Sequence, residues 1–309
     1  MSRAVVFERF GGPEVLELRE VPEPRAGAGE VRVRVTAIGL NPMDWLVAAR
    51  PEVAGMFGVR LPAGFGADLA GVVDEVGDGV EGFAVGDRVY GGAMSRAAAD
   101  HAVVPIAPSP LHRLAHTPDG LADELAAAIP TTGLTAAAVT SAMAPRPGET
   151  VLIGGAAGGV GVLAVQLARL AGARVIGTAS SGTFDFLRGL GAEPVEHGPG
   201  LVERVRAIAP DGVAAAADLF GTETALAALE LGVAPERIAT IAAGPNPPGA
   251  VRATGGADAT PDDLAGIANA IRAGDLVVPI AATFPLDRIR DAVALQASRH
   301  AHGKIVVVP

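Results

Sequence analysis

Apolar and polar residues follow two different patterns along this chain, and the change falls near residue 118. Before it, short segments alternate with a period of two, and Val31–Ala37 is an example. Such alternation is typical of half-buried β-strands. Pro and Gly interrupt these segments, as in Gly11-Gly12-Pro13 and Gly27-Ala28-Gly29. Short strands separated by turns predict a barrel or sandwich over residues 1–118.

From about Asp119, apolar runs alternate with helical patterns. Val151–Ile153 predicts a strand, and residues 160–171 then carry apolar side chains at helical spacing on one face. Further strands are expected at 174–177, 214–219 and 238–242. This alternation of strands and helices predicts a parallel, doubly wound sheet over residues 119–261.

Residues 262–309 form a third zone. Thr260 is a good N-cap, Pro261 suits the first helical position, and two acidic residues follow at the positive end of the helix dipole. Val277–Ile280 and Ile305–Val308 predict strands. The pattern leaves open whether these strands extend the second sheet or return to the first domain.

Composition narrows the class of protein. The chain has 309 residues, of which 50% are hydrophobic and 19% charged, so it can bury a large core. Its net charge of −10 argues against nucleic acid or an anionic membrane as a partner. Charges interrupt the apolar runs before a membrane-spanning length, and the uncharged stretch Leu125–Ala144 contains Pro130 and several threonines, so we interpret it as a buried helix. Because there is no cysteine, neither a disulfide nor a thiolate zinc ligand can form. With these properties we expect a cytoplasmic protein.

A glycine-rich turn carries the main chemical signal. It reads Gly155-Ala156-Ala157-Gly158-Gly159-Val160-Gly161, directly after a predicted strand and at the start of an amphipathic helix. Glycine permits a tight turn and a close approach of a pyrophosphate, and the helix N-terminus attracts the phosphate charge. This context predicts a dinucleotide site, although Ala156 departs from the G-x-G-x-x-G pattern. We assign Gly155, Gly158, Gly159, Val160 and Gly161 to the cofactor.

The end of the following strand bears on which dinucleotide binds. It reads Thr178-Ala179-Ser180-Ser181 and has no acidic residue to accept a hydrogen bond from a ribose 2′-hydroxyl, which disfavours NADH. Ser180 and Ser181 could donate to a 2′-phosphate, although no Lys or Arg stands beside them. We therefore expect NADPH, with NADH as the less favoured cofactor.

Several motifs together resemble one family. They are Gly66–Val73, Val85–Gly91, Ala128–Ala136, the glycine turn and Gly303–Val306. The chain resembles the medium-chain dehydrogenase/reductase superfamily, in its zinc-independent quinone oxidoreductase and enoyl reductase-like branch. The resemblance implies an α/β protein with a GroES-like catalytic domain (1–118), a Rossmann cofactor domain (119–261) and a C-terminal return to the catalytic domain (262–309).

The same resemblance bears on zinc. Asn41, three residues before Asp44, stands where zinc-dependent relatives have a cysteine ligand, and Ala67 stands at the histidine ligand. We therefore expect no metal site, and alcohol oxidation is disfavoured without a Lewis acid. The implied reaction is hydride transfer from NADPH to a quinone or an α,β-unsaturated carbonyl. The alternatives are a specialised biosynthetic enoyl reductase, or an NADPH-binding protein with a sensing or structural role.

Several residues are candidates for the catalytic, substrate and cofactor sites. Asn41 is expected to orient the substrate oxygen, although Asn before Pro is common in turns. Asp44, Tyr90, a histidine or water could donate the proton. Trp45 could stack on the substrate or simply pack. The residues expected around the substrate are Trp45, Met56, Phe57, Phe65 and Met94. The further residues expected at the cofactor are Thr132, Thr178, Ser180, Ser181, Phe220, Ala242, Ala243 and Lys304.

The expected partners are few. A small-molecule substrate is implied by the resemblance, as is a homodimer. Ala250–Thr254 could be an exposed edge strand that pairs across a two-fold axis.

Overall fold

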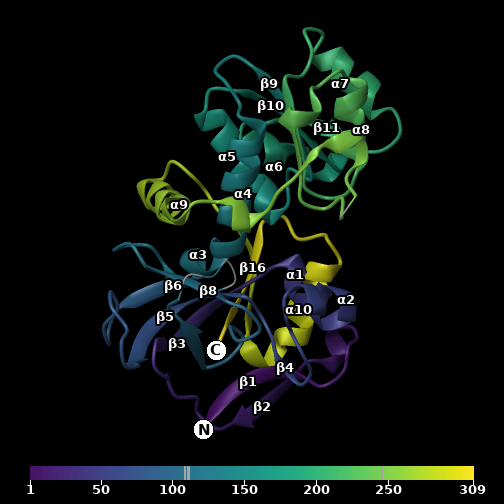
Figure 1. Ribbon diagram of the computed structural model, residues 1–309. Coiled ribbons are helices and arrows are strands. Elements are labelled where there is room, and N and C mark those ends of the chain that lie inside the picture. Colours follow the sequence, from purple (N-terminus) through teal and green to yellow (C-terminus); the bar gives the residue numbers. More distant parts are fainter. Residues whose placement is uncertain (108, 110–111, 245) are drawn as a thin grey trace. The chain divides into compact units, whose positions relative to one another are not determined.

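A computed structural model describes residues 1–107, 109, 112–244 and 246–309. The chain separates into two compact units. The barrel unit comprises Met1–Thr131, Leu264–Ala273 and Val278–Pro309, and the Rossmann unit comprises Thr132–Asp263 and Gly274–Val277. Residues 119–131, which we assigned to the cofactor domain, thus belong to the barrel unit. In Figure 1 the barrel unit runs from purple to blue and includes yellow C-terminal elements.

Two sheets are described in the barrel unit. The smaller has the order β2 (Glu17–Val21), β1 (Ser2–Phe7), β4 (Ala63–Gly64). The larger has the order β15 (Ile280–Pro285), β16 (Lys304–Val308), β3 (Glu30–Leu40), β5 (Asp68–Val76), β6 (Arg88–Ala93), β8 (His112–His116), and β7 (His101–Pro105) also pairs with β3.

β3 is the strand around which the larger sheet is built. Its alternation buries Val31, Val33 and Val35 in the barrel core, which confirms the predicted strand. β16 pairs antiparallel with β3, with Ile305 opposite Leu40, and β15 pairs parallel with β16. The C-terminal strands therefore belong to the barrel sheet.

One tail strand was predicted wrongly. We expected a strand at Val277–Ile280, but β15 begins only at Ile280. Gln166 explains the difference, because its side chain donates to Val277 O (2.8 Å) and accepts from Val277 N (2.8 Å). The backbone of Val277 is thus bonded within the Rossmann unit. The predicted helix start at Thr260 is confirmed, since its backbone N–H donates to Asp263 Oδ2 at 2.7 Å.

The helices lie between and after these strands. Their bounds are α1 Pro42–Ala49, α2 Pro51–Met56, α3 Asp123–Ala128, α4 Pro130–Met143, α5 Gly159–Leu170, α6 Phe184–Gly189, α7 Leu201–Ile208, α8 Glu223–Glu230, α9 Pro261–Ala273 and α10 Ile289–Ala297. Short 3₁₀ turns occupy Pro13–Val15, Ser181–Thr183, Pro235–Arg237, Pro248–Ala250, Gly256–Asp258 and Leu286–Arg288.

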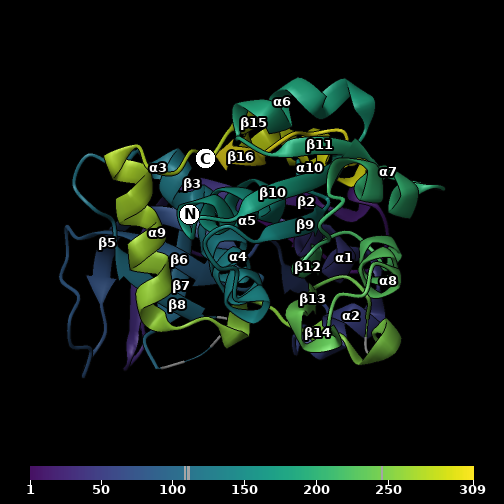
Figure 2. The same cartoon turned by 90° about the horizontal axis from the view of Figure 1, so that it is seen from above.

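The Rossmann unit contains a parallel sheet. Its order is β11 (Glu193–Glu196), β10 (Arg174–Ala179), β9 (Thr150–Gly154), β12 (Ala215–Asp218), β13 (Ile238–Thr240), β14 (Arg252–Ala253). Figure 2 shows the strands side by side in this sequence. Numbered from β9, the order is 3-2-1-4-5-6, the doubly wound arrangement predicted from the alternating pattern. The order reverses between β9 and β12, and ligands bind such sheets beyond the strand ends at that point.

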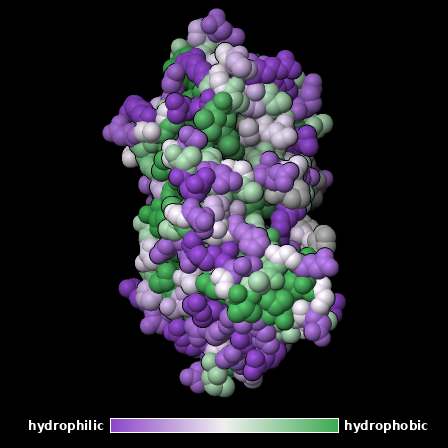
Figure 3. Space-filling view, turned by 90° about the vertical axis from the view of Figure 1, so that its left-hand side faces the viewer, coloured by the Kyte–Doolittle hydropathy of each residue, from purple (hydrophilic) through white to green (hydrophobic). Residues whose placement is uncertain are grey.

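One face of the molecule is largely polar. Hydrophilic residues spread across the face shown in Figure 3, with smaller apolar patches between them. Within the part of the chain that the structure describes, no helix is both long and apolar enough to cross a membrane.

Candidate functional site

The glycine turn joins β9 to α5 at the point where the strand order reverses. Gly155 has a φ of +70°, a conformation that L side chains rarely adopt. A Cβ atom on Gly161 would lie only 2.3 Å from Gly155 O and 2.7 Å from the Cα of Ala156. Glycine at 161 therefore lets α5 start directly against the turn.

β10 fixes the shape of this turn. Thr178 is buried at its end, and its hydroxyl accepts from Gly155 N at 3.3 Å. The carbonyl of Thr178 accepts from Ala156 N at the same distance. Thr178, predicted as a cofactor contact, thus braces the backbone that would hold the cofactor.

The other predicted cofactor residues are spread around this turn. Ser180 and Ser181 are exposed just beyond β10. Phe220 follows β12 and is 61% exposed. A Cβ atom added to Gly155 would lie 3.2 Å from the Cβ atom of Phe220. Ala242 and Ala243 follow β13, and their backbone N–H groups donate to the Thr240 hydroxyl. Thr132 is buried on α4.

This arrangement fits a dinucleotide. The first N–H groups of α5 have no carbonyl partner within their own helix, and they sit at the positive end of its dipole. Glycines at the turn keep side chains out of the space above those groups. The unit can therefore hold a pyrophosphate, with the ends of β10 and β12 on either side.

A buried polar cluster occupies one end of the barrel sheet. Asn41 follows β3, Asp68 begins β5 and Lys304 begins β16. Because Gly39 pairs with Asp68 and Leu40 pairs with Ile305, strand register brings these three side chains together. All three are at most 3% exposed. From the sequence we expected different roles for Asn41 and Lys304, and none for Asp68.

Asn41 bridges the two charges. Lys304 Nζ donates to Asn41 Oδ1 at 2.6 Å, and Asn41 Nδ2 donates to Asp68 Oδ2 at 2.8 Å. Turning the amide over would place NH₂ against the ammonium and oxygen against the carboxylate, so the two charges fix its orientation. Lys304 also donates to Leu40 O (2.7 Å), and Asp68 accepts from the Thr131 hydroxyl (2.7 Å) and backbone N–H (3.0 Å).

Burial shifts the pKa values of the two charged groups in this cluster. It raises the pKa of Asp68 and lowers the pKa of Lys304, because both would ionise away from water. Lys304, expected at the cofactor, is thus bonded within the barrel unit to Asn41 and Leu40.

Asp44 lies on the first turn of α1, beside Asn41. Its Oδ2 accepts from Asn41 N at 2.7 Å, while its buried Oδ1 has no hydrogen-bond partner among the described residues. Burial raises the pKa of Asp44 to about 7, and the charge of Asp68 adds to the rise. The amides of Asn41 and Ala67 and the charge of Lys304 act in the opposite direction. The carboxyl group can therefore carry a proton near neutral pH.

Two predicted substrate residues lie beside this carboxyl. Phe65 and Met94 line a small hollow together with Asp44, and the other lining residues are Phe7, Val47, Gly64, Gly66 and Ser95. We call it the Asp44 hollow. Both Phe65 and Met94 are buried.

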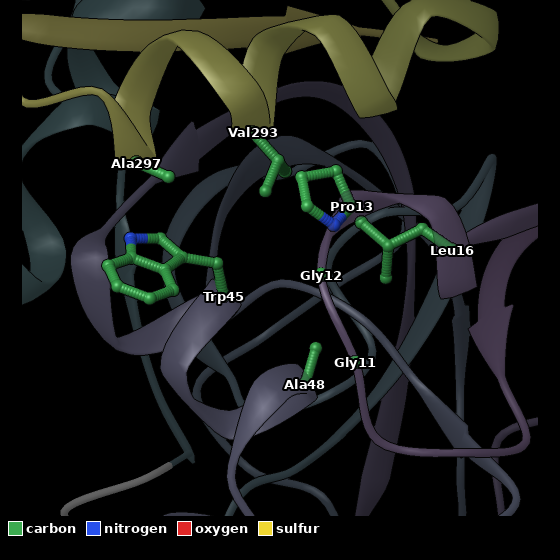
Figure 4. A pocket seen from close by; sticks show the side chains of 8 residues that line it. All are labelled: Gly11, Gly12, Pro13, Leu16, Trp45, Ala48, Val293 and Ala297. Atoms are coloured by element: carbon green, nitrogen blue, oxygen red, sulfur yellow. The ribbon is translucent and has the colours of Figure 1, made fainter.

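Trp45 faces a different pocket. It lines a small apolar pocket with Ala48 of α1, Val293 and Ala297 of α10, and the loop Gly11–Leu16 (Figure 4). Its indole Nε1 is buried without a hydrogen-bond partner among the described residues.

The remaining predicted residues are dispersed. Met56 is 78% exposed at the end of α2, and Phe57 packs against the barrel core. Tyr90 is fully buried on β6, and its hydroxyl donates to Leu264 O at 3.2 Å. Burial raises the pKa of Tyr90 to about 12. In the described residues, no group of three or more His, Cys, Asp or Glu side chains is placed to hold a metal ion.

Comparisons with known proteins agree with this architecture. The alcohol dehydrogenase GroES-like domain model matches residues 27–109, and the zinc-binding dehydrogenase model matches residues 190–307. The quinone oxidoreductase of Pseudomonas aeruginosa is 41% identical over 189 residues, which cover 59% of this chain and 54% of that protein. The chain thus spans about half the length of the curated relatives it matches.

Solved structures match over the whole chain. The quinone oxidoreductase of Pseudomonas syringae pv. Tomato is 30% identical with a TM-score of 0.86, and a mycobacterial protein complexed with NADPH is 28% identical with the same score. Both alignments cover 100% of each chain. The fold is therefore a GroES-like domain joined to a Rossmann domain. The chain belongs to the medium-chain dehydrogenase/reductase superfamily.

Proposed function

We propose that this protein uses NADPH to reduce a quinone or an α,β-unsaturated carbonyl compound, without zinc. The observation that carries the proposal is the glycine turn at the reversal point of the Rossmann sheet. The likeness to quinone oxidoreductases and to an NADPH complex supports it. The absence of cysteine and the residues Asn41 and Ala67 at the ligand positions support a zinc-independent reaction.

Bound NADPH would supply a hydride to an electron-poor carbon of the substrate. The substrate's electron pair then moves onto its carbonyl oxygen, and one proton completes the reduction. We infer that Asp44 holds this proton on Oδ1, since its Oδ2 is held by Asn41 N and the pKa of the carboxyl group is about 7. Tyr90 is the weaker candidate, because its hydroxyl is bonded to Leu264. Asp44 would regain its proton from water.

Asn41 would position the proton donor. Lys304 and Asp68 hold its amide in one orientation, and its backbone N–H holds the Asp44 carboxyl. The side chains of Phe65 and Met94 would limit water around the Asp44 proton. Asn41 would thereby position the donor. Its own amide is already bonded to Lys304, Asp68 and Gly39, so we do not propose the contact with the substrate oxygen that we expected from the sequence.

Turnover with a panel of quinones and enones tests the proposal, followed by the loss of reduced-nicotinamide absorbance. In Asp44→Asn the amide oxygen can still accept from Asn41 N, but the acidic proton is gone. We expect its kcat with an enone to fall by about 10²–10⁴-fold, the usual contribution of a general acid. Turnover with a quinone should fall less, because quinols take protons readily from solvent.

The exposed Asp78→Asn variant, in the same unit, is the matched control and should keep full activity. An Asp44→Asn variant with unchanged enone turnover would reject Asp44 as the donor. If NADPH binds but no acceptor is reduced by the unmodified protein, the non-reductive alternative holds instead.

We also propose a homodimer that forms along β14. This two-residue strand is the outer strand of the Rossmann sheet, and both Arg252 and Ala253 are exposed. An unpaired edge of this kind can pair with its own copy across a two-fold axis. A cytoplasmic location remains an expectation from the sequence.

A further inference from the structure

The ends of β10 and β11 place a serine and a histidine side by side. These strands are parallel neighbours with Ala179 opposite Glu196, so Ser180 and His197 are the next residues on each. The Ser180 hydroxyl lies 3.4 Å from His197 Nε2, and both residues are exposed. No Lys or Arg is adjacent to Ser180 in the sequence, and His197 is 17 residues further along the chain.

This pair is tied to the glycine turn. Thr178, two residues before Ser180, bonds both Gly155 N and Ala156 N. In a 3-2-1-4-5-6 sheet, the end of the second strand faces the ribose next to the adenine, where NAD-binding proteins place an acidic residue. Here that strand is β10, and a serine and a histidine stand at its end.

Among the described residues, His197 is the basic side chain bonded to Ser180, and the arginines on the neighbouring helices α6 and α7 have other partners. Arg204 of α7 donates to the carbonyls of four consecutive residues, Glu196 to Pro199, so its guanidinium shapes the loop that carries His197. Arg188 of α6 pairs with Asp185 at 2.6 Å. The neighbouring acids are Glu196, which is exposed, and Glu223 of α8, which accepts from Gly198 N at 2.6 Å.

We propose that Ser180 and His197 bind the 2′-phosphate of NADPH, with the protonated imidazole as the cation. The preference for NADPH over NADH is then pH-dependent. Histidine changes its charge between pH 5 and 8, whereas the Lys or Arg that commonly binds this phosphate stays charged. This proposal rests on the proposed cofactor and adds the residue that selects it.

The direction of the pH effect follows from linkage. A 2′-phosphate dianion favours the protonated imidazole, so NADPH binding takes up a proton once the free histidine is neutral. In that range the affinity for NADPH should fall by up to about tenfold per pH unit, while the affinity for NADH stays level. A charge-assisted hydrogen bond changes a Kd by about ten- to a hundredfold. The total change in the Kd of NADPH with pH should therefore not exceed this range.

Equilibrium titrations of NADPH and NADH at about pH 6.5 and about pH 8.5 test the proposal. The unmodified protein should prefer NADPH at the lower pH by at least about tenfold more than at the higher. His197→Gln should lose the preference at both pH values, and His197→Arg should keep it at both. His300→Gln, an exposed histidine of the barrel unit, is the matched control and should behave as the unmodified protein.

Either of two results would overturn it: a His197→Gln variant with the unmodified preference, or a preference that does not change with pH. Binding and turnover separate the two proposals. Quinone or enone reduction without a pH-dependent preference rejects only the role of His197. The expected binding pattern without reduction of any acceptor rejects only the reductase.

Discussion

The carboxyl group of Asp44 is buried with one oxygen bonded and the other without a partner among the described residues. Its pKa of about 7 lies well above that of a carboxyl group in an unfolded chain, about 3.9. Between about pH 3.9 and about pH 7, Asp44 holds a proton in the folded protein that it has released in the unfolded chain. The protonated carboxyl therefore contributes stability that is present below about pH 4 and is lost as the pH rises towards 7.

The first prediction concerns Asp44 and pH. The free energy of unfolding of the unmodified protein should fall, relative to Asp44→Asn, as the pH rises from about 4 to about 7. Urea unfolding at several pH values in that range measures it, with Asp78→Asn as the control. Parallel pH profiles for the unmodified protein and Asp44→Asn would show that the folded carboxyl titrates normally.

The second prediction concerns Lys304. Lys304→Met removes the cation that bonds Asn41 Oδ1 and Leu40 O and leaves Asp68 buried without a neutralising charge. We expect a loss of about 3–5 kcal/mol in the free energy of unfolding, as for other broken buried pairs. Adding Asp68→Asn to this variant should restore part of it. A loss below about 1 kcal/mol would mean that the cluster stays solvated.

The start of α5 depends on the glycines in the turn that joins it to β9, because these residues have no side chain. α5 packs its buried face in the Rossmann unit and begins at Gly159, immediately after the turn. The space at Gly161 is filled by the backbone of Gly155 and Ala156. The same backbone is held by Thr178 of β10, so turn, helix and neighbouring strand depend on one another.

The third prediction compares two helical glycines. Gly161→Ala should cost about 1–3 kcal/mol, because its Cβ would overlap Gly155 O, and it should weaken NADPH binding by displacing the turn. Gly189→Ala on α6 meets nothing within 4 Å and should change stability by less than about 1 kcal/mol. Thermal unfolding and NADPH titration measure both. Equal changes in stability and in NADPH binding for the two variants would contradict the close packing around Gly161.

The homodimer that we propose depends on the β14 edge. Thr254 N donates to Thr240 O at 2.9 Å, so residue 254 faces β13. The alternation of a strand then turns the N–H of Ala253 outward, where a second copy could accept it. Sheet pairing across that edge would extend the parallel sheet of one protomer into that of its partner.

The fourth prediction tests this edge. Ala253→Pro removes the outward N–H without removing a bond to β13, so it should give a monomer while the fold is retained. Light scattering after size-exclusion chromatography measures the mass, and circular dichroism checks the fold. A monomeric unmodified protein, or a dimeric Ala253→Pro variant, would reject pairing along β14.

Local chemistry was enough to predict some features of the fold and the site. The glycine turn, the start of α9 and the strand at residues 31–37 follow from neighbouring residues, because turn geometry, capping and alternation act over a few positions. Asn41 and Asp44 are three residues apart, so their pairing at the start of α1 is also local, although we did not predict it. The strand expected at Val277 failed because a side chain from α5 bonds that backbone.

The sequence alone therefore determined the class of fold and the presence of a dinucleotide turn. Only the tertiary structure decided which charges meet, since Lys304 reaches Asn41 across 263 residues and His197 reaches Ser180 across neighbouring strands. Register sets such contacts, and register depends on how whole strands pair and bury their faces. The turn at Gly155 to Gly161 could be predicted because its geometry is local, whereas the charges around each candidate site could not.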